Sequence, residues 1–172
     1  MTNDQAEFLL NHVYLPQIHN ERATTRRVIE AVPAENCEYK PDPKSMSAIE
    51  LAWHIASSEC FFMNGVADAA FNPGGGARPD SVKTPADVLA WYDENSAKAT
   101  ARLAALKGDA LTRMIDFFGV FNLPGIVYVG LMSNHSIHHR GQLSAYLRPM
   151  GAKVPRIYGG SADEPIQLPA NA

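Results

Sequence analysis

Four stretches of the chain carry apolar residues at helical spacing, and strong helix breakers separate them. The stretches span roughly residues 4–31, 47–70, 84–107 and 124–149. Apolar residues that recur every three or four positions form one face of an amphipathic helix. The segments between them contain prolines and glycines that cannot continue a helix. Long helices joined by loops of unequal length predict an all-α fold, a four-helix bundle with long crossover loops.

Capping residues mark the starts of the two middle helices. Ser47 and Glu50 form a capping box, in which the side chain of each residue satisfies a backbone amide of the other. Thr84 is an N-cap residue, and Pro85 follows it at the first helical position, which proline tolerates. Both helix starts are therefore strongly indicated.

Two other segments are less regular. Pro16 lies inside the first stretch, where its missing amide should kink the helix. Residues 109–124 are bulky and apolar in a pattern that fits an extended segment or a brief helical turn, so we leave them unassigned. The length of 172 residues fits one domain. We place the bundle in residues 1–158 and a C-terminal surface tail in residues 159–172.

Charge and composition exclude several classes of protein. The 15 basic and 18 acidic residues form no long runs, so we expect no nucleic-acid partner. No apolar run approaches the roughly 20 residues that span a bilayer, so we expect no membrane association. Cys37 and Cys60 are too few for a disulfide framework, and the N-terminus lacks the pattern of a secretory signal. These features predict a protein of the reducing cytoplasm.

A pair of histidines in the last stretch has the spacing of a metal half-site. His135 and His139 lie four residues apart, which places their Cβ atoms roughly 5–6 Å apart on one helix face. Their nitrogens can then converge on an ion with bonds of about 2.0–2.1 Å. Because Tyr128 and Leu131 share this stripe, we expect the rings to point inward. Two ligands rarely hold a divalent metal, and His54 on another helix is the best third candidate.

Neighbouring polar residues leave alternatives open. His138 competes with His139, because adjacent helix positions diverge by roughly 100° and both cannot join His135 on one ion. Glu50 is a candidate carboxylate or general base beside His54, although its role in the capping box already explains it. Gln142 could orient a bound water or a ligand imidazole, and a simple hydrogen bond between helices explains it equally well.

Three motifs resemble one known family. They are the Trp53-His54 pair of the second helix, the run HSIHHRGQL at residues 135–143, and YLRPMG at residues 146–151. Together with the helix order, they resemble the DinB/YfiT-like superfamily of metal-binding four-helix proteins, which is distinct from the DNA polymerase of the same name.

The resemblance implies a divalent metal held by His54, His135 and His139, with His138 as the bystander. It implies zinc or nickel, with iron as a further option, and a homodimer. Characterised relatives include S-transferases and an isomerase that use low-molecular-weight thiols. We therefore expect a metal-dependent enzyme with a small-molecule substrate, and S-transferase chemistry first. The alternatives are a hydrolase, in which the metal lowers the pKa of water toward about 7, and a non-catalytic, metal-binding, stress-associated dimer.

Overall fold

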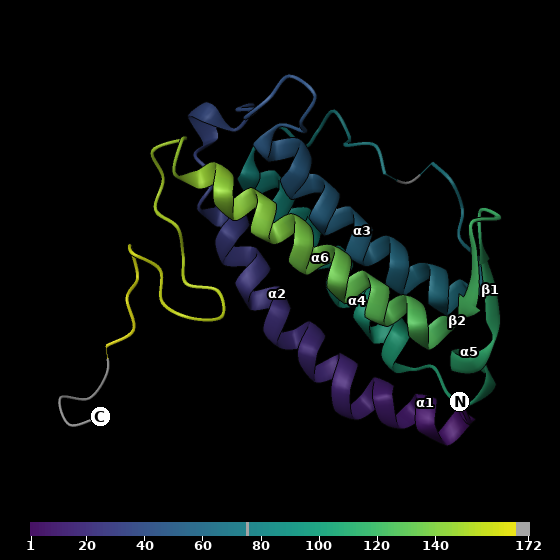
Figure 1. Cartoon of the computed structure of the whole chain (residues 1–172). Coiled ribbons are helices and arrows are strands. Elements are labelled where there is room, and N and C mark those ends of the chain that lie inside the picture. Colours follow the sequence, from purple (N-terminus) through teal and green to yellow (C-terminus); the bar gives the residue numbers. More distant parts are fainter. Residues whose placement is uncertain (75, 168–172) are drawn as a thin grey trace.

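Four long helical segments run side by side in the computed structural model, which describes residues 1–74 and 76–167 (Figure 1). The predicted helical bundle is confirmed, and α3 packs most extensively against α4 and α6. The first segment consists of α1, a π-helical turn and α2. The elements of the bundle are α1 (Asn3–Leu9), the π-helical turn (Leu10–Tyr14), α2 (Leu15–Glu30), α3 (Ala48–Asp68), α4 (Pro85–Ala104) and α6 (Gly125–Leu147), with a 3-10 turn (Ala34–Asn36) in the first crossover.

Both predicted helix starts are confirmed. The Ser47 amide donates to Glu50 Oε2 at 2.7 Å, and the Glu50 amide donates back to Ser47 Oγ at 3.3 Å. At the start of α4, Thr84 and Asp87 form the same reciprocal pair, with the Thr84 amide 2.8 Å from Asp87 Oδ2. Capping of this kind satisfies amides that no preceding turn can pair, and it determines where α3 places its later residues.

A π-helical turn precedes Pro16, and the kink expected at this proline stays a prediction. Proline has no amide hydrogen, so the carbonyl of His12 lacks its usual helical donor. The preceding turn, Leu10–Tyr14, is π-helical, and the Leu15 amide donates to the Leu10 carbonyl five residues back. This wider turn lets one helical segment continue from α1 into α2.

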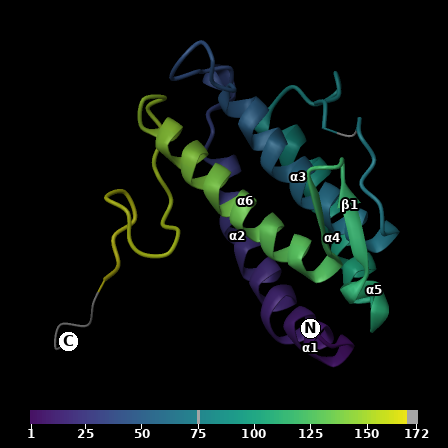
Figure 2. The same ribbon diagram turned by 45° about the vertical axis from the view of Figure 1, so that its right-hand side comes forward.

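The unassigned stretch forms a short helix and a β-hairpin. Its elements are α5 (Asp109–Thr112), β1 (Met114–Phe117) and β2 (Phe121–Pro124), and the strands pair antiparallel. Figure 2 shows the hairpin at the end of the bundle where α6 begins. Phe118 and Gly119 both have positive φ, as in a type I′ turn, which usually carries Asn-Gly. Phenylalanine in that place removes the sequence signal for a hairpin, and the left-handed conformation costs roughly 1–2 kcal/mol.

The bundle buries a polar network as well as its apolar core. The hydroxyls of Tyr92 and Ser136 donate to the carboxylate of Glu59, and all three side chains are buried. One turn beyond Ser136, Arg140 is only 1% exposed and pairs with Glu21 Oε2 at 2.5 Å. Its guanidinium also donates to Thr25 Oγ1 at 3.2 Å. Buried polar groups need such partners, so this network specifies which side of α6 faces inward.

The segment after α6 returns across the first helical segment. Arg140 donates to the Tyr158 hydroxyl, which in turn donates to Glu21 Oε2 at 2.9 Å. Asp163 accepts a bond of 2.9 Å from Arg148. The predicted tail, residues 159–172, falls partly outside the described residues, which end at 167. Its boundary at residue 158 stays a prediction.

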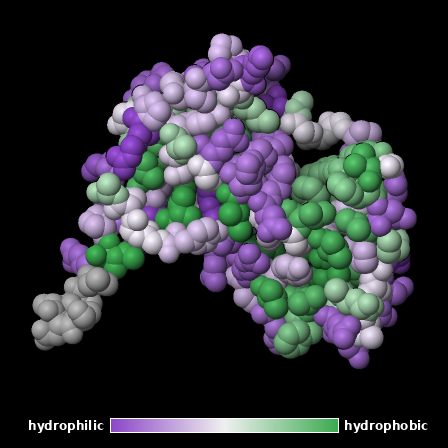
Figure 3. Space-filling model, viewed as in Figure 1, coloured by the Kyte–Doolittle hydropathy of each residue, from purple (hydrophilic) through white to green (hydrophobic). Residues whose placement is uncertain are grey.

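Large apolar side chains are exposed at one end of the molecule. In Figure 3 they gather on the end that carries α1 and the hairpin. The exposed residues from this end are Met1, Phe8, Val13, Met114, Phe118, Val120, Phe121 and Leu131. Among the described residues, no helix combines the length and the apolar character that crossing a membrane requires.

Candidate metal centre

The fold brings the three predicted histidines together. His54 lies on α3, and His135 and His139 lie one turn apart on α6, which packs beside it. One ring nitrogen from each histidine lies within 4.8 Å of the others, and the Nε2 atoms of His54 and His135 are 3.1 Å apart. Two nitrogens bound tetrahedrally to one zinc ion are separated by about 3.3 Å, given bonds of about 2.0–2.1 Å. Small side-chain rotations therefore allow all three to reach a common ion.

The histidines lie on a half-buried seam, so the expectation that they point into the bundle interior is wrong. All three are partly exposed, and Leu131, which was expected to share their buried stripe, is 37% exposed. The interior side of α6 instead carries Ser136 and Arg140, which find polar partners there. Apolar residues occur on several sides of α6. Their spacing therefore did not indicate which side of the helix faces the bundle interior.

Two polar side chains contact the outward nitrogens of the rings. Gln142 Oε1 lies 3.1 Å from Nδ1 of His139, and Gln142 Nε2 donates to the Tyr146 hydroxyl at 3.2 Å. With the amide oxygen facing the ring, the neutral tautomer protonated at Nδ1 satisfies this contact and leaves the Nε2 lone pair available to an ion. Ser58 Oγ lies 3.5 Å from Nδ1 of His54, at the long limit for a hydrogen bond. Partners of this kind orient metal-binding imidazoles, and this role for Gln142 stays a prediction.

The site favours neutral imidazoles. Burial, followed by the charges of His139, His54 and His138, lowers the pKa of His135 to about 4. Burial, followed by the charge of His139, also lowers the pKa of His54. Metal ions bind the deprotonated ring nitrogen. At neutral pH, His54 and His135 are therefore in the form that a metal requires.

Three other histidines lie outside this cluster. His138 follows His135 on α6 but is exposed, and it does not belong to the group that could share one ion. His12 and His19 are exposed on the first helical segment. His138 thus lies outside the cluster, and its role as a bystander stays a prediction.

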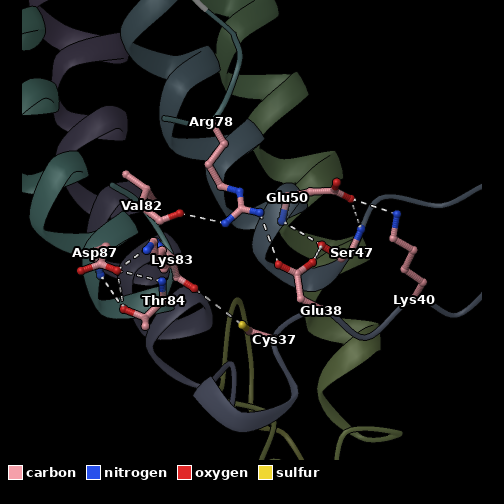
Figure 4. A network of polar contacts seen from close by, with 10 residues as sticks. All are labelled: Cys37, Glu38, Lys40, Ser47, Glu50, Arg78, Val82, Lys83, Thr84 and Asp87. Carbon is pink, nitrogen blue, oxygen red and sulfur yellow. Dashed lines mark hydrogen bonds and ion pairs between the residues drawn. The ribbon is translucent and has the colours of Figure 1, made fainter. Parts of the chain in front are cut away.

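The Glu50 side chain already has bonding partners at the start of α3. Its carboxylate accepts from the Ser47 amide and pairs with Lys40 at 3.2 Å (Figure 4). The Ser47 bond is the main cause that lowers the pKa of Glu50, and Lys40 adds to it. A carboxylate with a lowered pKa is a weaker base. Glu50 lines a cavity together with His54, but a role as general base stays a prediction.

Two cavities of different character adjoin His54. One, of 580 Å³, is lined by Lys40, Lys44, Arg78 and Trp53 among others. Figure 4 shows the Arg78 guanidinium held between the Val82 carbonyl, at 2.8 Å, and Glu38, at 3.3 Å. These cations come from the loops before α3 and α4, and no motif in the sequence predicted that they would meet.

The second cavity, of 300 Å³, lies between α3, the loop residues 72–74 and 76, and the tip of the hairpin. Its lining includes His54, Ser58, Phe61 and Phe118. The Trp53 indole donates to the Gly76 carbonyl at 3.0 Å and so fixes part of the loop that borders both cavities. Sequence reasoning missed Phe118 because its segment was unassigned. The sequence did indicate Ser58 as a neighbour of the site, because it lies one helical turn after His54.

The donor set fits a divalent transition metal. Neutral imidazole suits zinc, nickel and iron alike. Among residues 1–74 and 76–167, the cluster supplies three protein ligands. Catalytic zinc sites have three protein ligands and leave further positions for water or substrate, whereas structural sites are closed by four. The cluster could therefore hold an ion, and three histidine ligands would leave positions on that ion open to water or substrate.

The fold and the cluster define a class of protein: helical bundles with a candidate three-histidine metal site between two neighbouring helices. The chain belongs to the DinB family, whose profile matches residues 2–167. The match covers the whole bundle, including all three histidines and the hairpin.

Relatives and solved structures agree with this assignment. The chain is 33% identical to the uncharacterized protein YjoA of Bacillus subtilis over 135 residues, which cover 77% of this chain and 85% of that protein. It is 25% identical to the uncharacterized B. subtilis protein YrdA over 157 residues, covering 90% and 91%. The crystal structure of the DinB-like protein YjoA superposes with a TM-score of 0.70 at 29% identity, covering 84% of this chain and 96% of that one. A DinB-like protein from Bacillus cereus gives a TM-score of 0.71 at 23% identity, with coverage of 84% and 95%, and supports the fold alone.

Proposed function

We propose that this protein is a divalent-metal-dependent enzyme that transfers a low-molecular-weight thiol to an electrophilic small molecule. The observation that carries the proposal is the convergence of His54, His135 and His139 at a half-buried position that adjoins two cavities. When bound, zinc or nickel would supply Lewis-acid stabilisation of a thiolate at neutral pH.

The thiol in this reaction comes from a cosubstrate. Burial, followed by the charge of Glu59, raises the pKa of Cys60 to about 12. Burial also raises the pKa of Cys37. A thiol with a raised pKa is a poor nucleophile because little of it is thiolate at neutral pH. Neither cysteine of the chain is therefore suited to attack an electrophile.

The cation-lined cavity favours a thiol that carries carboxylates. Lys40, Lys44 and Arg78 line it, and two carboxylates oppose them, because Glu50 pairs with Lys40 and Glu38 pairs with Arg78, so one positive charge remains in excess. Ammonium and guanidinium groups recognise carboxylates by charge-assisted hydrogen bonds. Glutathione and bacillithiol carry carboxylates and mycothiol does not, so we expect the first two to be preferred.

The test is consumption of 1-chloro-2,4-dinitrobenzene by zinc- or nickel-loaded protein with each thiol. In this reaction a C–S bond forms, the C–Cl bond breaks, chloride leaves with the electron pair, and the thiol proton passes to solvent. We expect turnover that needs both metal and thiol and that His139→Ala abolishes. Consumption of the electrophile without added thiol would favour a metal-dependent hydrolase instead of a transferase. Stoichiometric metal without consumption of this or other electrophiles would favour the non-catalytic metal-binding dimer.

We further propose that the protein is a homodimer whose interface is formed by Phe8 on α1 and Leu131 on α6, with the hairpin outside it. Phe8 is 60% exposed and Leu131 is 37% exposed. Apolar patches of this kind mark surfaces of association. Light scattering should give twice the monomer mass for the wild type, and the double substitution Phe8→Glu with Leu131→Glu should give the monomer mass. A monomeric wild type would contradict the proposal.

A further inference from the structure

Phe118 occupies a backbone conformation that disfavours its residue type. Its φ is 54°, and that of Gly119 is 72°. The turn is fixed by a bond of 2.9 Å from the Val120 amide to the Phe117 carbonyl, and by one of 3.1 Å from the Gly119 amide to Asp116 Oδ2. Asparagine, aspartate or glycine is the usual choice at this position. Residues held in rarely populated conformations concentrate at functional sites.

Burial of the ring in the core does not explain why phenylalanine occupies position 118. The Phe118 side chain is 47% exposed. Its ring lies nearly parallel to that of Phe61, with centroids 6.5 Å apart and planes 15° apart. Both rings line the 300 Å³ cavity that includes His54 and Ser58. The strained turn thus places an aromatic ring over a cavity at the metal centre.

The two cavities at His54 offer different chemistry. On one side the lining is aromatic, with Phe61 and Phe118, and on the other it is cationic, with Lys40 and Arg78. An aromatic wall attracts flat apolar groups by area burial and by ring stacking. An anionic thiol and an apolar electrophile could therefore approach the metal from opposite sides of His54.

The geometry points to Phe118 as a specificity-determining residue that binds a planar apolar group of the second substrate against Phe61, beside the metal centre. The inference rests on the proposed function, since it assigns one of the two cavities to the electrophile. It names the substrate class: small molecules with an aromatic or similarly flat apolar substituent next to the reacting atom.

Two variants separate recognition from folding. Phe118→Asn removes the ring and supplies a residue that the turn prefers, so we expect its melting temperature to equal or exceed that of the wild type. Phe121→Ala is the matched control, because Phe121 belongs to the same hairpin, is 51% exposed and does not line the cavity. A drop of more than about 5 °C for Phe118→Asn, which corresponds to roughly 1.3–2.5 kcal/mol in a domain of this size, would show that the ring serves stability and would overturn the inference.

The main measurement compares two metal-binding probes by calorimetry. Acetohydroxamic and benzohydroxamic acid share the metal-binding group and differ in a methyl or a phenyl substituent. We expect zinc-loaded wild type and Phe121→Ala to bind the phenyl compound at least tenfold more tightly. In Phe118→Asn the ratio should fall below threefold, while affinity for the methyl compound stays unchanged. An unchanged ratio would overturn the inference.

A metal-free measurement separates this inference from the proposed function. If zinc-loaded protein bound neither hydroxamate, the metal site would fail as proposed. The cavity would still be tested by ¹⁹F NMR of 4-fluorophenol with metal-free protein. Wild type and Phe121→Ala should broaden the resonance, and Phe118→Asn should broaden it much less. Equal broadening by all three proteins would overturn the assignment of Phe118.

Discussion

Oε1 of Gln142 lies 3.1 Å from Nδ1 of His139, one turn further along α6. This contact holds the ring with Nε2 free to bind an ion. Replacing Gln142 with leucine should lower zinc affinity about 10–100-fold, which is typical for loss of such a partner. Competitive titration with a chelating indicator measures the change. Gln142→Glu keeps an acceptor and should retain affinity near the wild type, and Asn134→Ala on the same helix should have no effect. Equal affinity of Gln142→Leu and wild type would contradict this role.

The second prediction separates His139 from His138. His139→Ala should abolish stoichiometric metal binding, because two imidazoles remain where three are needed. His138→Ala should bind close to one equivalent, since His138 is exposed and outside the cluster. Elemental analysis of the dialysed protein measures the stoichiometry, and far-ultraviolet circular dichroism should show the same helix content in both variants. Equal loss of metal from both would indicate a different ligand set.

The third prediction concerns the buried carboxyl of Glu59. Burial raises its pKa, while hydrogen bonds from Ser136 and Tyr92 oppose the shift only in part. The folded state then binds its proton more tightly than the unfolded state, so its contribution to stability is fully present below the unfolded pKa of about 4.3 and is lost as pH rises through the folded pKa.

We therefore expect Glu59→Gln, which cannot ionise, to gain stability relative to the wild type as pH rises from about 4 to 8. Urea unfolding at several pH values measures the free energy of unfolding. Glu35→Gln is the control at an exposed glutamate and should keep the wild-type pH dependence. A pH dependence of Glu59→Gln identical to that of the wild type would refute the prediction.

The fourth prediction compares two helical glycines. A Cβ at Gly65 would overlap the ring of Phe71, which packs on α3 against the aromatic cluster below the hairpin. Gly65→Ala should therefore lower the free energy of unfolding by about 1–3 kcal/mol, as overpacking does. Gly141→Ala on α6 meets nothing within 4 Å and should raise it by about 0.5–1 kcal/mol. Thermal or urea unfolding checks both signs.

The helical part of the fold was predictable because local signals determine it. The capping box at Ser47 lies in the sequence itself, and the structure realises it. The hairpin was not predictable, because its strands are only four residues long and Phe118 stands where the turn usually has asparagine. Phe117 packs against Phe71 and Tyr128 beneath the hairpin. This tertiary packing stabilises a turn that the local sequence does not favour.

The grouping of His54, His135 and His139 could be predicted from the sequence, but their depth in the bundle could not. Spacing indicated the pair on α6, and the family resemblance chose His139 over His138. The depth of the site was misjudged because Ser136 and Arg140, both polar, occupy the interior side of α6. The cavities depend on loops and on the hairpin, and contacts between segments so distant in sequence leave no local pattern.

Between α3 and α6, the residues of the candidate metal site are different from the buried polar residues that connect the helices. Glu59 and Arg140 connect the helices through buried polar contacts. The three imidazoles are only half-buried, so we expect them to contribute little to the stability of the fold. Evolution could therefore exchange metals, reshape the neighbouring loops or abandon catalysis altogether in one descendant while the same frame persists in another. A family built in this way is expected to share its shape far more widely than its reactions.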